Sequence, residues 1–80
     1  MSPTVFREKG YRFYFLSNEE LRIHVHVTCE DGEAKFWLEP LVSLAVYHGL
    51  NQKKLQEIQK IVEVRADEIK KAWQKHFGKR

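Results

Sequence analysis

The stretch that decides the fold is residues 23–38, which read IHVHVTCEDGEAKFWL. Apolar and polar side chains alternate strictly through residues 23–29, the two-residue period of a half-buried strand. The dipeptide Asp31-Gly32 follows, which is typical of a two-residue hairpin turn, and residues 34–38 form the return strand. The sequence therefore predicts an antiparallel hairpin at the centre of a sheet.

A two-residue turn at Asp31-Gly32 also sets the expected register, and a slip of one residue would exchange the two faces. In this register Lys35 lies opposite Thr28, and Glu39 lies opposite His24. One face, which we expect to be core, carries Val25, Val27, Cys29, Ala34, Phe36 and Leu38. The other face, which we expect to hold the candidate site, carries His24, His26, Thr28, Lys35, Trp37 and Glu39.

Further strands are expected on both sides of this hairpin. Toward the N-terminus, residues 4–7 and 11–16 are rich in aromatic and β-branched side chains, and Gly10 stands in the turn between them. Toward the C-terminus, Pro40 ends the return strand or marks an edge. Residues 42–46 fit either a short strand or one helical turn, and we favour the strand because Gly49 follows so closely.

The second half of the sequence predicts one amphipathic helix over about residues 52–77. Its apolar residues recur at steps of three and four: Leu55, Ile58, Val62, Ala66, Ile69, Trp73 and Phe77. Asn51 suits the N-cap, and Gly78 suits the position just past the C-terminus. Such a helix would be ~39 Å long. It must therefore overhang the sheet or bend near residues 63–67, and an overhanging apolar stripe offers a homodimer surface.

These elements predict an α+β fold in which an antiparallel sheet of four to five strands packs against one long C-terminal amphipathic helix. The strands form two hairpins within residues 3–46, and residues 1–80 are expected to be one domain. The only cysteine, Cys29, has no partner in the chain for a disulfide. Since neither a signal peptide nor an apolar run of about 20 residues is present, we expect a cytoplasmic protein with no membrane partner.

The polar face of the hairpin suggests three kinds of chemistry. The imidazoles of His24 and His26 suit general acid–base work near neutral pH, and Lys35 on the same face can stabilise a phosphorane. With Trp37 stacked on an unpaired base, this set fits metal-independent RNA cleavage. The two histidines and Glu39 are candidates for half of a metal site. The plain alternative is a solvent-facing histidine pair packed on Trp37, and we favour neither a metal nor a cofactor.

The net charge gives a weaker indication of the ligand. Fourteen Lys and Arg residues against eleven Asp and Glu residues give a net charge of +3, which permits a nucleic-acid ligand without requiring one. The excess gathers near the C-terminus, at Lys70, Lys71 and Lys75. Cations there also suit the C-terminal end of a helix.

Several motifs, taken in order, resemble a bacterial family catalogued as domain of unknown function 4160. They are Pro3-Thr4-Val5-Phe6, Gly10-Tyr11-Arg12-Phe13, His24-Val25-His26-Val27, Gly32-Glu33-Ala34-Lys35-Phe36-Trp37-Leu38-Glu39-Pro40, Ala72-Trp73 and Phe77-Gly78. The resemblance covers nearly the whole chain. It implies that the family's recurring residues are His24, His26, Lys35, Trp37 and Trp73. Ile23 departs from the pattern, because members commonly carry Pro before the His-x-His segment.

The resemblance also implies a small protein that is often encoded beside a second small protein, in a suspected toxin–antitoxin pair. We therefore expect a toxin–antitoxin component that acts by binding this neighbouring protein, with RNA or DNA as a further ligand. The residues expected to bind are Trp37, Lys35, Lys70, Lys71 and Lys75. The alternatives are a ribonuclease-like toxin that uses the histidine and lysine face, and a metal-binding protein.

Overall fold

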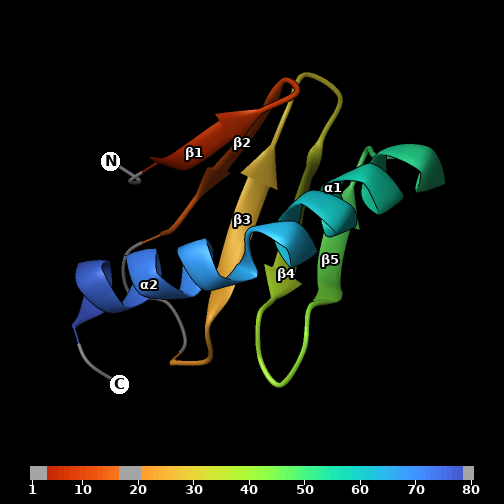
Figure 1. Cartoon of the computed structure of the whole chain (residues 1–80). Coiled ribbons are helices and arrows are strands. Elements are labelled where there is room, and N and C mark those ends of the chain that lie inside the picture. Colours follow the sequence, from red (N-terminus) through yellow and green to blue (C-terminus); the bar gives the residue numbers. More distant parts are fainter. Residues whose placement is uncertain (1–3, 17–20, 79–80) are drawn as a thin grey trace.

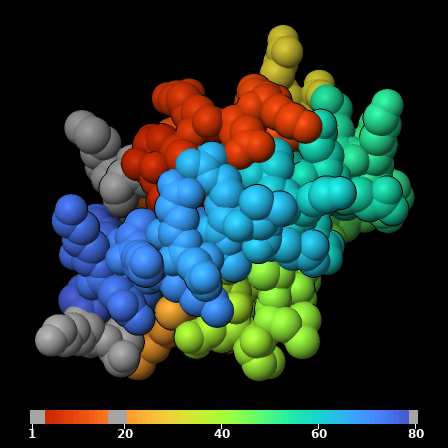
Figure 2. Space-filling view, viewed as in Figure 1, coloured from red at the N-terminus to blue at the C-terminus, as the bar shows by residue number. Residues whose placement is uncertain are grey.

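The computed structural model describes residues 4–16 and 21–78. Within them the elements are β1 (Thr4–Glu8), β2 (Tyr11–Tyr14), β3 (His24–Thr28), β4 (Glu33–Trp37), β5 (Ser43–His48), α1 (Gln52–Val64) and α2 (Ala66–Phe77). The strands form one antiparallel sheet, and both helices cross the same face of it (Figure 1). In Figure 2 the side chains of the helices cover much of this side of the molecule. The α+β class is confirmed.

The sheet is a meander in the order β1-β2-β3-β4-β5, so each strand pairs with the next one in the sequence. The expected arrangement of two hairpins is therefore incomplete, because β2 pairs with β3 and β4 with β5 as well. The strand favoured for residues 42–46 is confirmed as β5, which continues to His48, two residues past the expected limit. Ala45 is an extra residue in this strand, since Lys35 faces Val46 while Phe36 faces Leu44.

The central hairpin has a four-residue loop instead of the expected two-residue turn. The Cys29 amide donates to the Gly32 carbonyl oxygen at 2.9 Å, and neither Asp31 nor Gly32 has the positive φ that a type I′ turn requires. Thr28 consequently lies opposite Glu33, and the whole register differs from the expected one by two residues. Because two is the side-chain period of a strand, both faces keep their expected members.

The core lies between the sheet and the helices. The sheet contributes apolar side chains from its inner face, and the helices contribute the stripe that the sequence pattern indicates. The buried residues include Phe13, Phe15, Val25, Val27, Phe36, Leu38, Leu55, Ile58, Val62, Ile69 and Trp73. This confirms the expected core face of the hairpin, apart from Cys29, which is only partly buried at its loop end.

The C-terminal half is two helices, so the prediction of one long helix is wrong. The break is at Arg65, inside the segment where a bend was the stated alternative. The Arg65 guanidinium pairs with Glu8 of β1 at 2.9 Å and with Glu68 of α2 at 2.8 Å. It also lies 3.5 Å from the centre of the Phe6 ring. These contacts tie the break to the β1 edge of the sheet.

The expected cap of α1 is confirmed. The Asn51 side-chain oxygen accepts a hydrogen bond from the Lys54 amide at 2.8 Å, which satisfies one of the free donors of the first turn. Leu50 and Leu55 flank this cap and are both buried. The Lys54 ammonium also pairs with the Asp31 carboxylate at 3.0 Å, so the start of α1 is held to the β3–β4 loop.

Candidate functional site

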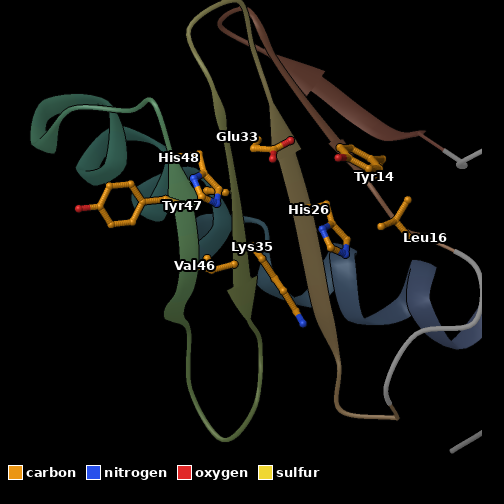
Figure 3. A pocket seen from close by; sticks show the side chains of 9 residues that line it. Tyr14, Leu16, His26, Glu33, Lys35, Val46, Tyr47 and His48 are labelled. Carbon is orange, nitrogen blue, oxygen red and sulfur yellow. The ribbon is translucent and has the colours of Figure 1, made fainter.

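The face of the sheet opposite the helices, which we call the open face, carries a row of rings and cations. Tyr14 on β2 stacks on His26 of β3, with ring centroids 5.4 Å apart and an interplanar angle of 27°. These two residues are also cross-strand partners. The Arg12 guanidinium lies 4.6 Å from the centre of the Tyr14 ring. Figure 3 shows Tyr14, His26 and Lys35 on this face, each on a different strand.

Trp37 on β4 holds two further cations of the open face. The Arg22 guanidinium lies 4.2 Å from the centre of the indole, and the Lys35 ammonium lies 4.5 Å from it. Arg22 is held in addition by a hydrogen bond from its Nε atom to the carbonyl oxygen of Glu39, at 2.8 Å. Cation–π contacts of this kind fix long flexible side chains over a ring. The indole is thus already in contact with cations of its own chain.

We call this set the open-face cluster. It consists of Arg12, Tyr14, Arg22, His26, Lys35 and Trp37. Three of its members are permanent or near-permanent cations and three carry aromatic rings. Such a mixture can neutralise phosphates and stack on bases at the same time.

A pocket of about 300 Å³ lies on the open face and reaches from three cluster residues, Tyr14, His26 and Lys35, to β5 (Figure 3). Its lining consists of Tyr14, Leu16, His26, Glu33, Ala34, Lys35, Val46, Tyr47 and His48. In Figure 3 the ring of Tyr47 points away from the pocket, off the outer side of β5. The pocket therefore widens the open face beyond the row of rings, and Glu33 brings one negative charge to it.

His24 has a different environment from His26, although the two share a face. It is 0% exposed, and its ring lies 5.0 Å from that of Trp73 on α2 and 5.6 Å from that of Trp37. β2 ends at Tyr14, opposite His26, so His24 has no partner in the β2–β3 ladder. The Nδ1 atom of His24 lies 2.7 Å from the Arg22 carbonyl oxygen. Since a carbonyl only accepts, Nδ1 carries a proton.

The structure thus brings His26 and Lys35 together more closely than expected, as direct cross-strand partners, but it encloses His24. A general acid or base must reach the reacting atom directly or through one water. Within the described residues His24 has no exposed surface for such a contact. The burial therefore favours a packing role, in which His24 joins the open face to Trp73.

The other predicted site residues do not belong to the open-face cluster. In the observed register Trp37, and not Glu39, lies opposite His24, so the expected two-histidine and carboxylate set is not assembled. Across residues 4–16 and 21–78, no three His, Cys, Asp or Glu side chains are grouped to hold a metal ion. Lys70, Lys71 and Lys75 are on α2, which crosses the opposite face of the sheet. They are not part of the open-face cluster.

Sequence reasoning missed Arg12, Tyr14 and Arg22 as members of the site. A signal for the first two was present, because the alternation in YRFY at residues 11–14 places Tyr11 and Phe13 on one face and Arg12 and Tyr14 on the other. Arg22 precedes β3 and has no periodic pattern to place it. Its position follows from its contact with Trp37, which only the fold reveals.

In the described residues, the fold is a small α+β sheet with both helices on one face and the open-face cluster on the other. The chain belongs to the family described as domain of unknown function (DUF4160), whose model matches residues 10–74. Neither the curated proteins nor the solved structures give a match to the chain. Among the described residues, no helix combines the length and the apolar character needed to cross a membrane.

Proposed function

We propose that this protein acts by binding single-stranded nucleic acid on its open face. The observation that carries the proposal is the open-face cluster, in which three cations and three rings from β2, β3, β4 and the residues before β3 share the sheet face opposite the helices. Single strands are bound in this way, since cations follow the backbone while bases stack on flat side chains. A duplex hides its base faces, so the cluster suits it less.

The parts of the cluster have distinct roles in this proposal. Tyr14 and His26 form one stacked pair and the Arg12 guanidinium lies over the Tyr14 ring, so a base would add to this stack of flat groups. Arg12 lies over Tyr14, and Arg22 and Lys35 lie over Trp37, so positive charge for phosphates stands at both aromatic groups. Trp37 serves mainly to hold its two cations. The pocket next to β5 gives room for a neighbouring nucleotide.

The geometry supports binding more than cleavage. RNA cleavage without a metal needs one group to take a proton from the 2′-hydroxyl and another to give one to the leaving oxygen. His26 is suitably exposed for one of these tasks, while His24 is enclosed. The toxin–antitoxin role, the neighbouring protein as partner and the cytoplasmic location follow from the resemblance and from the sequence, and they stay predictions.

Fluorescence anisotropy with a labelled single-stranded RNA oligonucleotide tests the proposal over a series of salt concentrations. If three cations contact phosphates, the slope of log K against log salt is expected to be about −2, at ~0.7 per contact. Arg22→Ala/Lys35→Ala should lower the magnitude of that slope by about 1.4. The matched control is Lys71→Ala/Lys75→Ala, which removes the same charge from α2.

The control should leave the slope unchanged, and circular dichroism should verify that both variants are folded. The same series with a duplex of equal length is expected to show weaker binding. Absence of any binding to the single strand would reject the proposal. Equal losses in the two double variants would also reject it, because binding would then follow total charge and not the open face.

A further inference from the structure

The outer edge of the sheet, at β5, lacks the charged side chains that keep other strands from pairing with an edge. β5 is the last strand in the sheet order, and in the described part of the chain no strand pairs with its outer side. Its sequence, SLAVYH, contains no Asp, Glu, Lys or Arg. Leu44, Val46 and Tyr47 are 37%, 50% and 44% exposed. Edge strands usually carry charged residues, above all Lys, which keep other strands from pairing with them.

The opposite edge of the same sheet, at β1, does carry charged side chains. β1 carries Arg7 and Glu8 within five residues. Glu8 is paired with Arg65 at the junction of the two helices. The contrast between the edges indicates that the exposure of β5 is not a general property of this small sheet. It is confined to one strand, and that strand borders the pocket of the open face.

We propose that β5 pairs antiparallel with β5 of a second copy of this chain, so that the two sheets become one. The bulge at Ala45 sets the register. Leu44 lies opposite Phe36 and Tyr47 opposite Ala34, so both of these β5 residues belong to the helix side of the sheet. Without the extra residue, positions three apart would point to opposite faces.

If the two-fold axis that relates the two copies passes between Ala45 and Val46, the two β5 strands are complementary to each other. Leu44 then lies opposite the partner's Tyr47 on the helix side. Ser43 lies opposite the partner's His48 on the open face, where their β4 partners are Trp37 and Glu33. In these two pairs each residue thus meets a residue of the same face, as an isologous interface demands. The strand lacks Asp, Glu, Lys and Arg, so it does not oppose like carboxylates or ammonium groups.

The first helix adds cover to this pairing. Figures 1 and 3, which view the sheet from opposite sides, both show α1 beginning beyond the outer side of β5, near the strand's C-terminal end. In an antiparallel pair this overhang stands above the N-terminal end of the partner strand, which carries Leu44. A second copy therefore covers an exposed apolar residue of each strand. A six-residue strand pair is smaller than a standard interface of ~1,600 Å², so the dimer is expected to depend on concentration.

Light scattering after gel filtration, over a series of protein concentrations, tests the proposal without any nucleic acid. The native chain is expected to pass from monomer to dimer as concentration rises. Val46→Lys brings two cations to the two-fold axis and should keep the chain monomeric. The matched control is Val64→Lys, which makes the same change at a side chain that is 76% exposed on α1. It should leave the dimer intact.

Two results would overturn the proposal. One is a native chain that remains monomeric up to its solubility limit. The other is a dimer that survives Val46→Lys, and if Val64→Lys alone abolished it, the helix surface would be the interface. Circular dichroism and a thermal melt of each variant show that the chain is folded, so that loss of the dimer is not loss of structure.

Disulfide cross-linking tests the register, in a Cys29→Ser background. Leu44→Cys and Tyr47→Cys proteins, mixed and oxidised, should form a mixed disulfide, because the two positions are cross-strand partners at a Cβ separation of ~5 Å. Each variant alone should cross-link poorly, since two copies of position 44 are offset by three residues, or ~10 Å. Equal cross-linking of single variants and mixture would refute this register.

Discussion

Lys35 lies directly opposite His26 in the β3–β4 pair, and its ammonium group lies 4.5 Å from the centre of the Trp37 ring. A cation, an imidazole and an indole thus occupy neighbouring, partly buried positions on the open face. The proposed binding function depends on this arrangement, together with the Tyr14 ring on the far side of His26.

Replacement of the Tyr14 ring is expected to weaken binding of a single-stranded oligonucleotide. Stacking of a base on an aromatic side chain contributes ~1–3 kcal/mol, so Tyr14→Ala should lower affinity by roughly 5- to 150-fold. Tyr14→Phe keeps the ring and should bind almost as the native chain does. Anisotropy titrations of the three proteins decide the matter, and equal affinity for Tyr14→Ala and the native chain would argue against a stacking platform.

The two histidines are expected to differ sharply in their contribution to stability. His24 is fully enclosed between Trp73 and Trp37, so His24→Ala should lower the free energy of unfolding by ~2–4 kcal/mol. His26 is only partly buried, and His26→Ala should cost ~1 kcal/mol or less. Urea unfolding followed by circular dichroism measures both. Similar losses for the two variants would contradict the packing role of His24.

The protein is expected to leave bound RNA intact, because only one of the two histidines is exposed to a substrate. A labelled single-stranded RNA incubated from about pH 5 to pH 8, where imidazole gains and loses its proton, should give no fragments on a denaturing gel. The His26→Ala protein, prepared in the same way, detects contaminating nuclease. Cleavage by the native chain that this variant lacks would restore the ribonuclease alternative.

Stability is expected to fall at high pH through Tyr11. Burial, followed by the hydrogen bond from its hydroxyl to the Glu57 carboxylate at 2.7 Å, raises the pKa of Tyr11 from 10.0 to about 12. The unfolded chain therefore loses this proton first as pH rises. The contribution is complete below pH 10 and is lost as pH rises toward 12.

Urea unfolding at several pH values measures this dependence, with Tyr11→Phe as the control. The variant lacks the titrating hydroxyl, so its decline over this pH interval should be smaller than that of the native chain. Parallel curves for the two proteins would show that Tyr11 does not cause the decline.

Much of the fold could be predicted from the sequence because its signals are local. The alternation of residues 23–29 and the helical stripe from Leu55 to Phe77 each follow from the geometry of a single element. The helix break could be placed only as an alternative. It is held by Arg65 contacts with Glu8 and Phe6, residues almost sixty positions away, for which no local pattern exists.

The candidate site was less predictable, because it depends on register and on burial. Asp31-Gly32 has the composition of a two-residue turn, but the loop lies against β5, where a Cβ atom on Gly32 would collide with the His48 carbonyl oxygen. The two-residue shift kept the faces and changed every cross-strand pair. The enclosure of His24 has no sequence signal either, since Trp73 approaches it from the other end of the chain.

The most direct test of the open-face proposal is a titration of the ¹⁵N-labelled protein with a single-stranded RNA oligonucleotide, followed by amide NMR spectra. The proposal predicts the largest shifts at Arg12, Tyr14, His26, Lys35 and Trp37, with small shifts along the exposed side of α1 and α2. Shifts concentrated at Lys70, Lys71 and Lys75, or none at saturating RNA, would contradict it.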